Sequence, residues 1–143
     1  MAECLFCKII AREIPASIVY EDERVLAFND INPQGPTHVL VVPKRHIATL
    51  NDLGAADDAI VGELVRRAAA IAQDRGIAAG GYRTVFNTNR DAGQTVFHIH
   101  LHLIGGRSLD WPAAQGEAFL RRAVEVKNVW VPYGDLESEP TLS

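Results

Sequence analysis

Hydrophobic and polar residues alternate in several short stretches of the chain, and a two-residue period is typical of strands. The clearest stretch is residues 98–104, His-Ile-His-Leu-His-Leu-Ile. Other short runs rich in apolar and β-branched residues are bounded by turn-forming residues. We predict strands over 17–20, 24–29, 37–42, 82–87 and 96–104. Residues 39–42 are all apolar, which indicates that the third strand is buried on both faces.

One long segment has a helical period instead. Between residues 55 and 75 apolar side chains recur every three or four positions, which predicts an amphipathic helix. Gly76 follows it at the place of a C-terminal capping glycine. Shorter helices are predicted over 6–12 and 117–126. One main helix and hairpin-like neighbouring strands predict an α+β domain with a mainly antiparallel five-stranded sheet.

Composition narrows the function classes. The chain has 143 residues, 48% hydrophobic and 22% charged, which is ordinary for a single globular domain. Its net charge of -4 argues against nucleic acid as a partner, and no apolar run is long enough to predict a membrane span. The N-terminus lacks the pattern of a secretory signal, and the only two cysteines are too close to form a disulfide framework. We therefore expect a reducing, cytoplasmic location.

Two groups of residues carry candidate chemistry. Alternation along a strand places His98, His100 and His102 on one face, where imidazoles can attack, carry protons or bind metal. Taken alone, the row is also compatible with incidental surface histidines or with a pure metal site. The second group is Cys4 and Cys7, which could be a redox pair, two buried thiols or half of a zinc site.

The chain resembles the histidine-triad family of nucleotide hydrolases and transferases. The triad itself matches, and the matching motifs that accompany it include Glu13–Ala16, Tyr20–Asp22, Pro36–His38, Val42–Ile47 and Gly93–Phe97. Residues 105–107, Gly-Gly-Arg, followed by Trp111 and Pro112 are most similar to the purine nucleoside phosphoramidase branch. The resemblance implies a domain over 1–112. Residues 113–143 would then be an extension, a short helix and a frayed acidic tail, that is not a separate domain.

The resemblance also implies a mechanism and its residues. His100 would attack the α-phosphorus of a purine nucleotide, and water would then discharge the covalent nucleotidyl-histidine to release AMP or GMP. His102 and His38 would donate hydrogen bonds to phosphate oxygens or the leaving group, and with Thr95 they would relay a proton to it. His98 completes the catalytic set.

Substrate-binding positions follow from the same resemblance. The Asp30 carboxylate would hold the ribose hydroxyls. The expected phosphate contacts are Asn87, Gly93, Gln94 and Thr95. The expected apolar wall of the base pocket consists of Leu5, Phe6, Ile9, Phe28, Ile31 and Leu40. Ordinary core packing is the alternative for each member of that wall.

Cys4, Cys7, His46 and His98 would surround one structural zinc ion, as in many bacterial-type triad proteins. A closed tetrahedral site of this kind would leave His100 and His102 for catalysis. The family also implies a symmetric homodimer that extends the sheet across two chains. A phosphoramidase is the expected activity; a dinucleoside-polyphosphate hydrolase and a nucleotide-binding scaffold protein without turnover are the alternatives.

Overall fold

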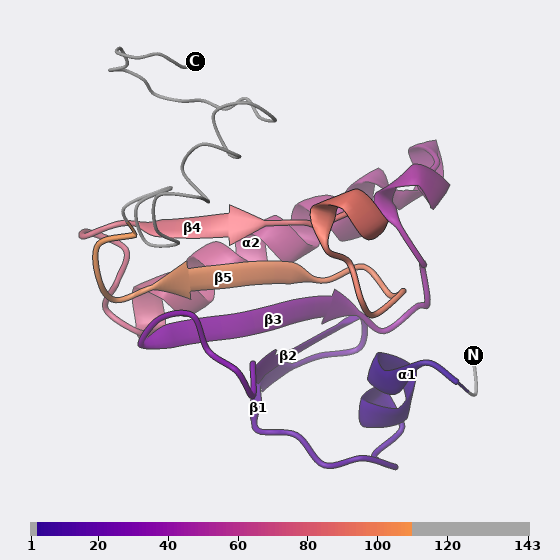
Figure 1. The fold of residues 1–143 in the computed structure, drawn as a ribbon, viewed down its shortest axis with the longest axis horizontal. Helices are drawn as coiled ribbons and strands as arrows, with labels where there is room; N and C mark the ends of the chain where they lie inside the picture. The colour runs from indigo at the N-terminus through magenta and orange to yellow at the C-terminus, as the bar shows by residue number, and fades with distance from the viewer. Residues whose placement is uncertain (1–2, 110–143) are drawn as a thin grey trace. The chain divides into compact units, whose positions relative to one another are not determined.

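Five strands form one antiparallel sheet in the computed structural model, which describes residues 3–109 (Figure 1). They are β1 (Ile18–Glu21), β2 (Val25–Asn29), β3 (Thr37–Pro43), β4 (Tyr82–Val85) and β5 (Leu101–Gly105). Their order across the sheet is β1-β2-β3-β5-β4, and each neighbouring pair is antiparallel. Every residue of β3 is buried, including the apolar run 39–42 from which burial is predicted. The predicted α+β class and five-stranded sheet are confirmed.

Within residues 3–109, two α-helices accompany the sheet: α1 (Leu5–Ile10) and α2 (Asp58–Asp74). Short 3-10 turns lie at Leu50–Asp52, Ala55–Asp57 and Arg90–Ala92. The first turn of the predicted long helix is thus 3-10, and α2 proper begins at Asp58. Gly76 has a φ of 73°, which confirms its role after the end of α2, because a glycine adopts this left-handed conformation without strain.

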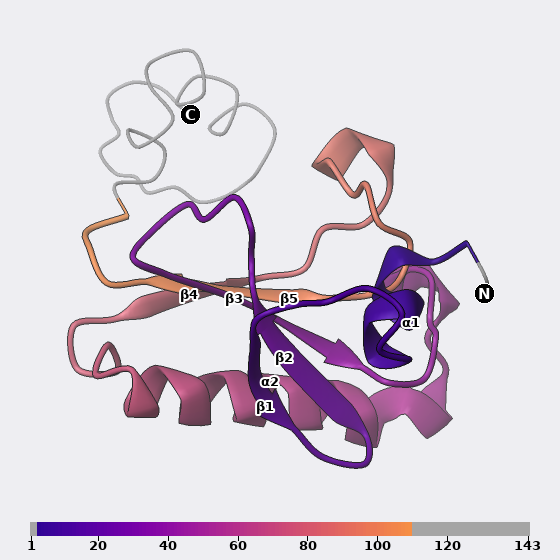
Figure 2. The same cartoon turned by 90° about the horizontal axis from the view of Figure 1, so that it is seen from below.

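The two faces of the sheet pack against different helices. The side chains of Val25, Val39 and Leu101 share a buried cluster with Leu64 and other residues of α2. A separate cluster joins Leu26, Phe28, Leu40 and Val42 to Phe6 and Ile9 of α1. Figure 2 shows α2 running along one face of the sheet. The alternation of side chains in β2 and β3 therefore divides the core in two, and α1 covers part of the other face.

The fifth strand is shorter than the predicted 96–104, because it begins at Leu101. Leu101 pairs with Val41, so a longer ladder would set Ile99 against Pro43, which has no N–H to donate. The Ile99 N–H donates instead to the Ile47 carbonyl at 2.7 Å. Similarly, β4 ends at Val85 rather than at residue 87.

The predicted helix over 117–126, the boundary at residue 112 and the acidic tail lie outside the described residues. Within residues 3–109, helices that are both long and apolar enough to cross a membrane are absent.

Candidate active site and adjoining metal cluster

The sheet register brings the histidines of β3 and β5 to the face that α1 shares. His102 pairs directly with Leu40, and His38 lies two residues before Leu40 on the same side of β3. Ile99, Leu101 and Leu103 point into the opposite core beneath α2, as the alternating sequence predicts. The His100 and His102 ring centroids are 4.9 Å apart, so the row of imidazoles extends to His100, just before the start of β5.

His100 has one ring nitrogen fixed by the backbone. Its Nδ1 lies 2.8 Å from the His98 carbonyl oxygen, which can only accept, so the ring carries its proton on Nδ1. Burial lowers the pKa of His100, which favours a neutral ring with a lone pair on Nε2. The Phe6 ring packs edge-on against it at 5.0 Å. An oriented, neutral imidazole of this kind is equipped to act as a nucleophile.

Asp30, His38 and His102 form a second group, the Asp/His cluster. The backbone N–H of Gln34 donates to His38 Nδ1 at 2.9 Å, so a neutral His38 carries its proton on Nε2. That nitrogen lies 2.9 Å from His102 Nδ1 and 3.3 Å from Asp30 Oδ2. Burial lowers the pKa of His102 to about 4, with further lowering from His100 and His38. His102 is therefore neutral and, as the acceptor from His38, holds its own proton on Nε2.

The Asp/His cluster is compact enough to be considered as a metal site. However, the His38 and His102 ring centroids are 5.2 Å apart while the facing nitrogens are 2.9 Å apart. The distance between the centroids is close to the distance between the nitrogens plus the radii of the two rings. The two imidazoles therefore point at each other along one line. Lone pairs of metal ligands converge on an ion beside that line, whereas a shared proton lies on it. We therefore interpret this cluster as a hydrogen-bond relay.

The Cys/His cluster, Cys4, Cys7, His46 and His98, has the opposite arrangement. His98 Nε2 donates to the Pro43 carbonyl at 2.7 Å, so the lone pair of its Nδ1 faces the two sulfurs. His98 Nδ1 lies 3.4 Å from Cys4 Sγ and 3.6 Å from Cys7 Sγ. His46 Nδ1 lies 3.4 Å from Cys7 Sγ. All four donor atoms lie within 4.8 Å of one another.

These distances match a tetrahedral ion. Zinc–sulfur and zinc–nitrogen bonds at tetrahedral angles put sulfur and nitrogen ligands roughly 3.5 Å apart. Burial, followed by the neighbouring Cys4, raises the pKa of the Cys7 thiol to about 11. A thiol with that pKa becomes a thiolate near neutral pH only when a cation binds it. The four residues can therefore hold a divalent metal ion, and their soft sulfur donors suit zinc.

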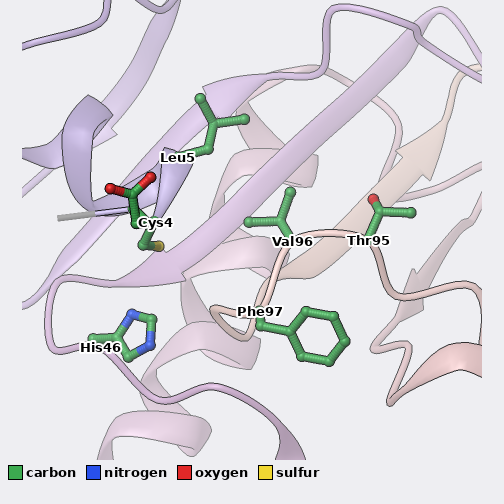
Figure 3. Close-up of a pocket in the computed structure, with 7 residues that line it drawn as sticks. Cys4, Leu5, His46, Thr95, Val96 and Phe97 are labelled. Atoms are coloured by element: carbon green, nitrogen blue, oxygen red, sulfur yellow. The ribbon is translucent and has the colours of Figure 1, made fainter. Parts of the chain in front are cut away.

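A pocket of about 530 Å³ opens beside the Cys/His cluster (Figure 3). Cys4 and His46 belong to its lining, together with Thr95 of the expected phosphate contacts and the side chain of Phe97. Thr95, Val96 and Phe97 follow one another along the segment that leads into the triad (Figure 3). The pocket thus places Thr95, one of the predicted phosphate-binding residues, next to the Cys/His cluster.

Two other predicted phosphate contacts have structural tasks in the same segment. The Gln94 side chain accepts from the Asn89 N–H at 2.8 Å and donates to the carbonyls of Ala48 and Val96 at 2.9 and 3.1 Å. Its backbone N–H also donates to the Asn89 carbonyl, at 3.1 Å, so both the side-chain amide and the backbone N–H of Gln94 hold the loop together. Gly93 has a φ of 85°, and a Cβ there would meet nothing within 4 Å. Backbone conformation, rather than crowding, makes glycine suitable here.

The expected base-pocket wall divides into buried and open members. Phe6, Ile9, Phe28 and Leu40 are all less than 7% exposed and pack in the α1 core. Leu5 is 43% exposed, and Ile31 is 92% exposed next to Asp30. The buried members form a continuous apolar floor, and only the exposed ones present a large surface to a ligand. Asn87, the remaining phosphate candidate, is half-buried beyond the end of β4.

Three backbone groups that orient the rings could not be identified from the sequence, although the resemblance implies that some backbone carbonyl accepts from the second ring nitrogen of His100. They are the Gln34 N–H and the carbonyls of Pro43 and His98. Since every residue has such groups, composition and motif spacing carry no signal for them. Only the path of the chain, which brings the residue 34 turn to His38 and the end of β3 to His98, reveals their roles.

Comparisons with known proteins identify the family of this chain. A HIT domain model matches residues 11–109. The chain is 53% identical over 107 residues to the purine nucleoside phosphoramidase of Escherichia coli K12, which covers 75% of this chain and 90% of that protein.

Solved structures give the same result. A HIT family hydrolase from Legionella pneumophila Philadelphia 1 has a TM-score of 0.76 and 54% identity, covering 77% of this chain and 98% of that one. A zinc-bound histidine triad family protein from Mycobacterium smegmatis has a TM-score of 0.65 and 37% identity, covering 76% and 78% of the two chains. Because the match spans most of the chain and both sets of histidines, this protein belongs to the HIT-domain, or histidine-triad, family.

Proposed function

We propose that this protein is a purine nucleoside phosphoramidase that works through a covalent nucleotidyl-histidine. The observation that carries the proposal is the orientation of His100, whose Nδ1 is bonded to the His98 carbonyl and whose Nε2 is left with the lone pair. The 53% identity to a protein of that activity supports the choice of substrate class. The similar solved structures include a HIT family hydrolase, which also supports a hydrolytic reaction.

The reaction has two displacements at phosphorus. His100 Nε2 forms a bond to the α-phosphorus while the phosphorus–nitrogen bond of the substrate breaks, and the departing amine takes up a proton. Water then attacks the nucleotidyl-histidine and returns a proton to the groups that protonated the amine, which releases AMP or GMP and restores the neutral imidazole. His102 donates through Nε2, and we assign the delivery of the leaving-group proton to His102, His38 and Thr95.

Substrate binding is assigned to the residues around this nucleophile. Asp30 accepts hydrogen bonds from the ribose hydroxyls, and Asn87 with the Gly93–Thr95 segment contacts the phosphate. The base lies on the apolar residues near α1 and on Ile31, where a two-ring purine buries more apolar surface than a pyrimidine. The exposure of Ile31 supports this placement, because its side chain is available to pack against a base.

We also propose that the Cys/His cluster binds one structural zinc ion in each chain. Such an ion joins the N-terminal helix to the segments around His46 and His98 and takes no part in the phosphoryl transfer. The zinc-bound relative from Mycobacterium smegmatis supports the metal's identity. Cys4 and Cys7 do not form a disulfide, which fits a protein of the reducing cytosol.

A homodimer completes the proposal. Strands β1 and β4 are the two edges of the sheet, and pairing an edge with a second chain removes a row of unsatisfied backbone groups. Light scattering at micromolar concentration should give twice the chain mass. A mass of one chain would contradict the dimer without affecting the assignment of the active site.

Steady-state kinetics with two substrates tests the activity. Adenosine phosphoramidate should have the larger kcat/KM, and diadenosine polyphosphate the smaller one. The reverse order would assign the protein to the dinucleoside-polyphosphate hydrolases. Binding of AMP without turnover of either substrate would reject the enzymatic proposal altogether.

A further inference from the structure

The proton on His38 Nε2 has two acceptors. It faces His102 Nδ1 at 2.9 Å and Asp30 Oδ2 at 3.3 Å, and one proton cannot donate fully to both. The Gln34 N–H occupies the other ring nitrogen, so His38 has no second N–H to offer. Anything that changes the accepting strength of Asp30 therefore changes the hydrogen bond between His38 and His102.

Asp30 connects this buried proton to the surface. Its Oδ1 accepts from the Asn32 N–H at 2.8 Å, and its own N–H donates to the His38 carbonyl at 2.9 Å, so the carboxylate is held in one orientation. The Asp30 side chain is 18% exposed, whereas the His38 side chain is 3% exposed. A ligand can thus reach the carboxylate, but it cannot reach the His38 ring directly.

We propose that Asp30 is a positioning residue that couples recognition of the ribose to the hydrogen-bonding state of His102. When ribose hydroxyls donate to Asp30, they satisfy its oxygens and weaken its attraction for the His38 proton. That proton is then donated wholly to His102 Nδ1. His102 keeps the tautomer with its proton on Nε2, the nitrogen that donates towards the substrate, and the stronger hydrogen bond from His38 stabilises this tautomer further.

The inference rests on the proposed function and adds a prediction that simple ribose binding does not make. A contact that holds the ribose equally in the ground state and the transition state changes KM alone. A contact that also orders His102 changes kcat, because the donor is better oriented when charge develops on the phosphate.

The first experiment does not require catalytic turnover. Protein with nitrogen-15-labelled histidine is recorded free, with saturating adenosine, and with saturating 2′,3′-dideoxyadenosine as the matched control. We expect His38 and His102 to carry their protons on Nε2 in all three states. Adenosine should move the His102 Nδ1 signal upfield, as stronger hydrogen-bond acceptance does, and the dideoxy compound should not.

The ligand-free Asp30→Asn variant gives the same comparison without any nucleoside. A neutral amide oxygen is a weaker acceptor than a carboxylate, so the His102 Nδ1 signal should move in the direction that adenosine causes in the wild type. Unchanged His38 and His102 signals in this variant, or a His38 proton found on Nδ1, would overturn the inference.

The kinetic experiment is a cycle of two substrates and two proteins. Removing the ribose hydroxyls from adenosine phosphoramidate should lower kcat of the wild type about tenfold, and should change kcat of Asp30→Asn less than about twofold. If only KM changes in the wild type, Asp30 is a binding residue and the coupling is wrong. Failure of adenosine to shift His102 at saturation would refute the coupling while hydrolysis through His100 still stood. Absence of any hydrolysis would refute the proposed function, and the spectra of the free proteins would still decide the effect of Asp30 on His102.

Discussion

Two clusters that contain histidines lie on either side of His100. Each uses an imidazole ring, one as a lone-pair donor and the other as a proton donor. In the Cys/His cluster, the Pro43 carbonyl holds the proton of His98 on Nε2, so its other nitrogen points a lone pair at two sulfurs. In the Asp/His cluster, the Gln34 N–H makes His38 a donor, so its other nitrogen points a proton at a second imidazole. One backbone contact decides each outcome.

The comparison teaches that closeness of potential ligands does not define a metal site. Both clusters bring three or more donor atoms within 4.8 Å. In the Cys/His cluster the separations of 3.4 to 3.6 Å are those of ligands around a common centre. In the Asp/His cluster the two rings point along one line and share a proton. The direction of the lone pairs, rather than the distance, separates the two.

His100 is connected to both clusters. It bonds to the carbonyl of His98, a member of the first, and its ring centroid lies 4.9 Å from that of His102, a member of the second. His100, the proposed nucleophile, is therefore oriented by a residue of the Cys/His cluster and lies next to His102 of the Asp/His cluster. Substitutions can separate these contributions.

The largest effect is expected for His100→Ala. Removing the attacking nitrogen should lower kcat by at least about 10³-fold, while AMP binding stays within about tenfold because it depends on many contacts. Rapid-quench mass spectrometry of the wild type should find the nucleotidyl group on His100. An adduct on any other residue would require a different nucleophile.

Loss of the Cys/His cluster should come next. Cys4→Ser and Cys7→Ser should each reduce the zinc content from about one ion per chain to well below that, and should lower Tm by about 10 °C. His102→Asn is the matched control, because it alters the other cluster and should retain the metal. If elemental analysis finds no zinc in wild-type protein that was prepared without chelators, the proposed zinc site is wrong.

The stability of the protein should depend on pH through the Asp/His cluster. Burial lowers the pKa of His102 from 6.5 to about 4 in the folded protein, so the unfolded chain binds this proton first as the solution is acidified. The free energy of unfolding should therefore fall from about pH 6.5 downwards, by about 1 kcal/mol between pH 7 and pH 5 after allowance for solvent screening. Burial lowers the pKa of His38 also, which acts in the same direction.

Urea denaturation at several pH values measures this effect. The His102→Asn variant should lose less stability on acidification than the wild type in the same buffers, and the contribution of a metal cancels in that difference. Parallel pH profiles for the two proteins would mean that His102 is not held neutral in the fold.

Much of this architecture could be predicted from the sequence. The alternation of residues 98–104 predicts which side chains enter the α2 core, and the apolar run before Pro43 predicts the buried central strand. Strand length was predicted less well: β5 starts at Leu101 because its partner strand ends at a proline, which is a property of the pair and not of either segment.

Membership of the clusters could be proposed only through resemblance to a family. Cys4 and His98 are 94 residues apart in sequence, and Asp30 and His102 are brought together by strand pairing. For His100 the resemblance implies that a backbone carbonyl accepts from the second ring nitrogen, and the His98 carbonyl confirms it. The tautomers of His38 and His98 could not be predicted, since they depend on single backbone atoms such as the Gln34 N–H. These atoms acquire their roles only when the chain has folded.

The smallest effect on activity and zinc content is expected at Phe6, whose ring packs against His100 and against His98 of the Cys/His cluster. It lies edge-on to His100 at 5.0 Å and to His98 at 6.0 Å, and it is 4% exposed. Phe6→Leu keeps most of the buried apolar surface but loses the edge-on aromatic contacts, so the free energy of unfolding should fall by about 1–2 kcal/mol. Because backbone contacts rather than Phe6 fix the tautomers of both histidines, kcat should change less than about threefold and the zinc content should be unchanged. Chemical denaturation, steady-state kinetics and elemental analysis of this one variant test the three expectations together. A tenfold loss of kcat in a variant that keeps its zinc would show that side-chain packing, and not only the His98 carbonyl, orients the nucleophile.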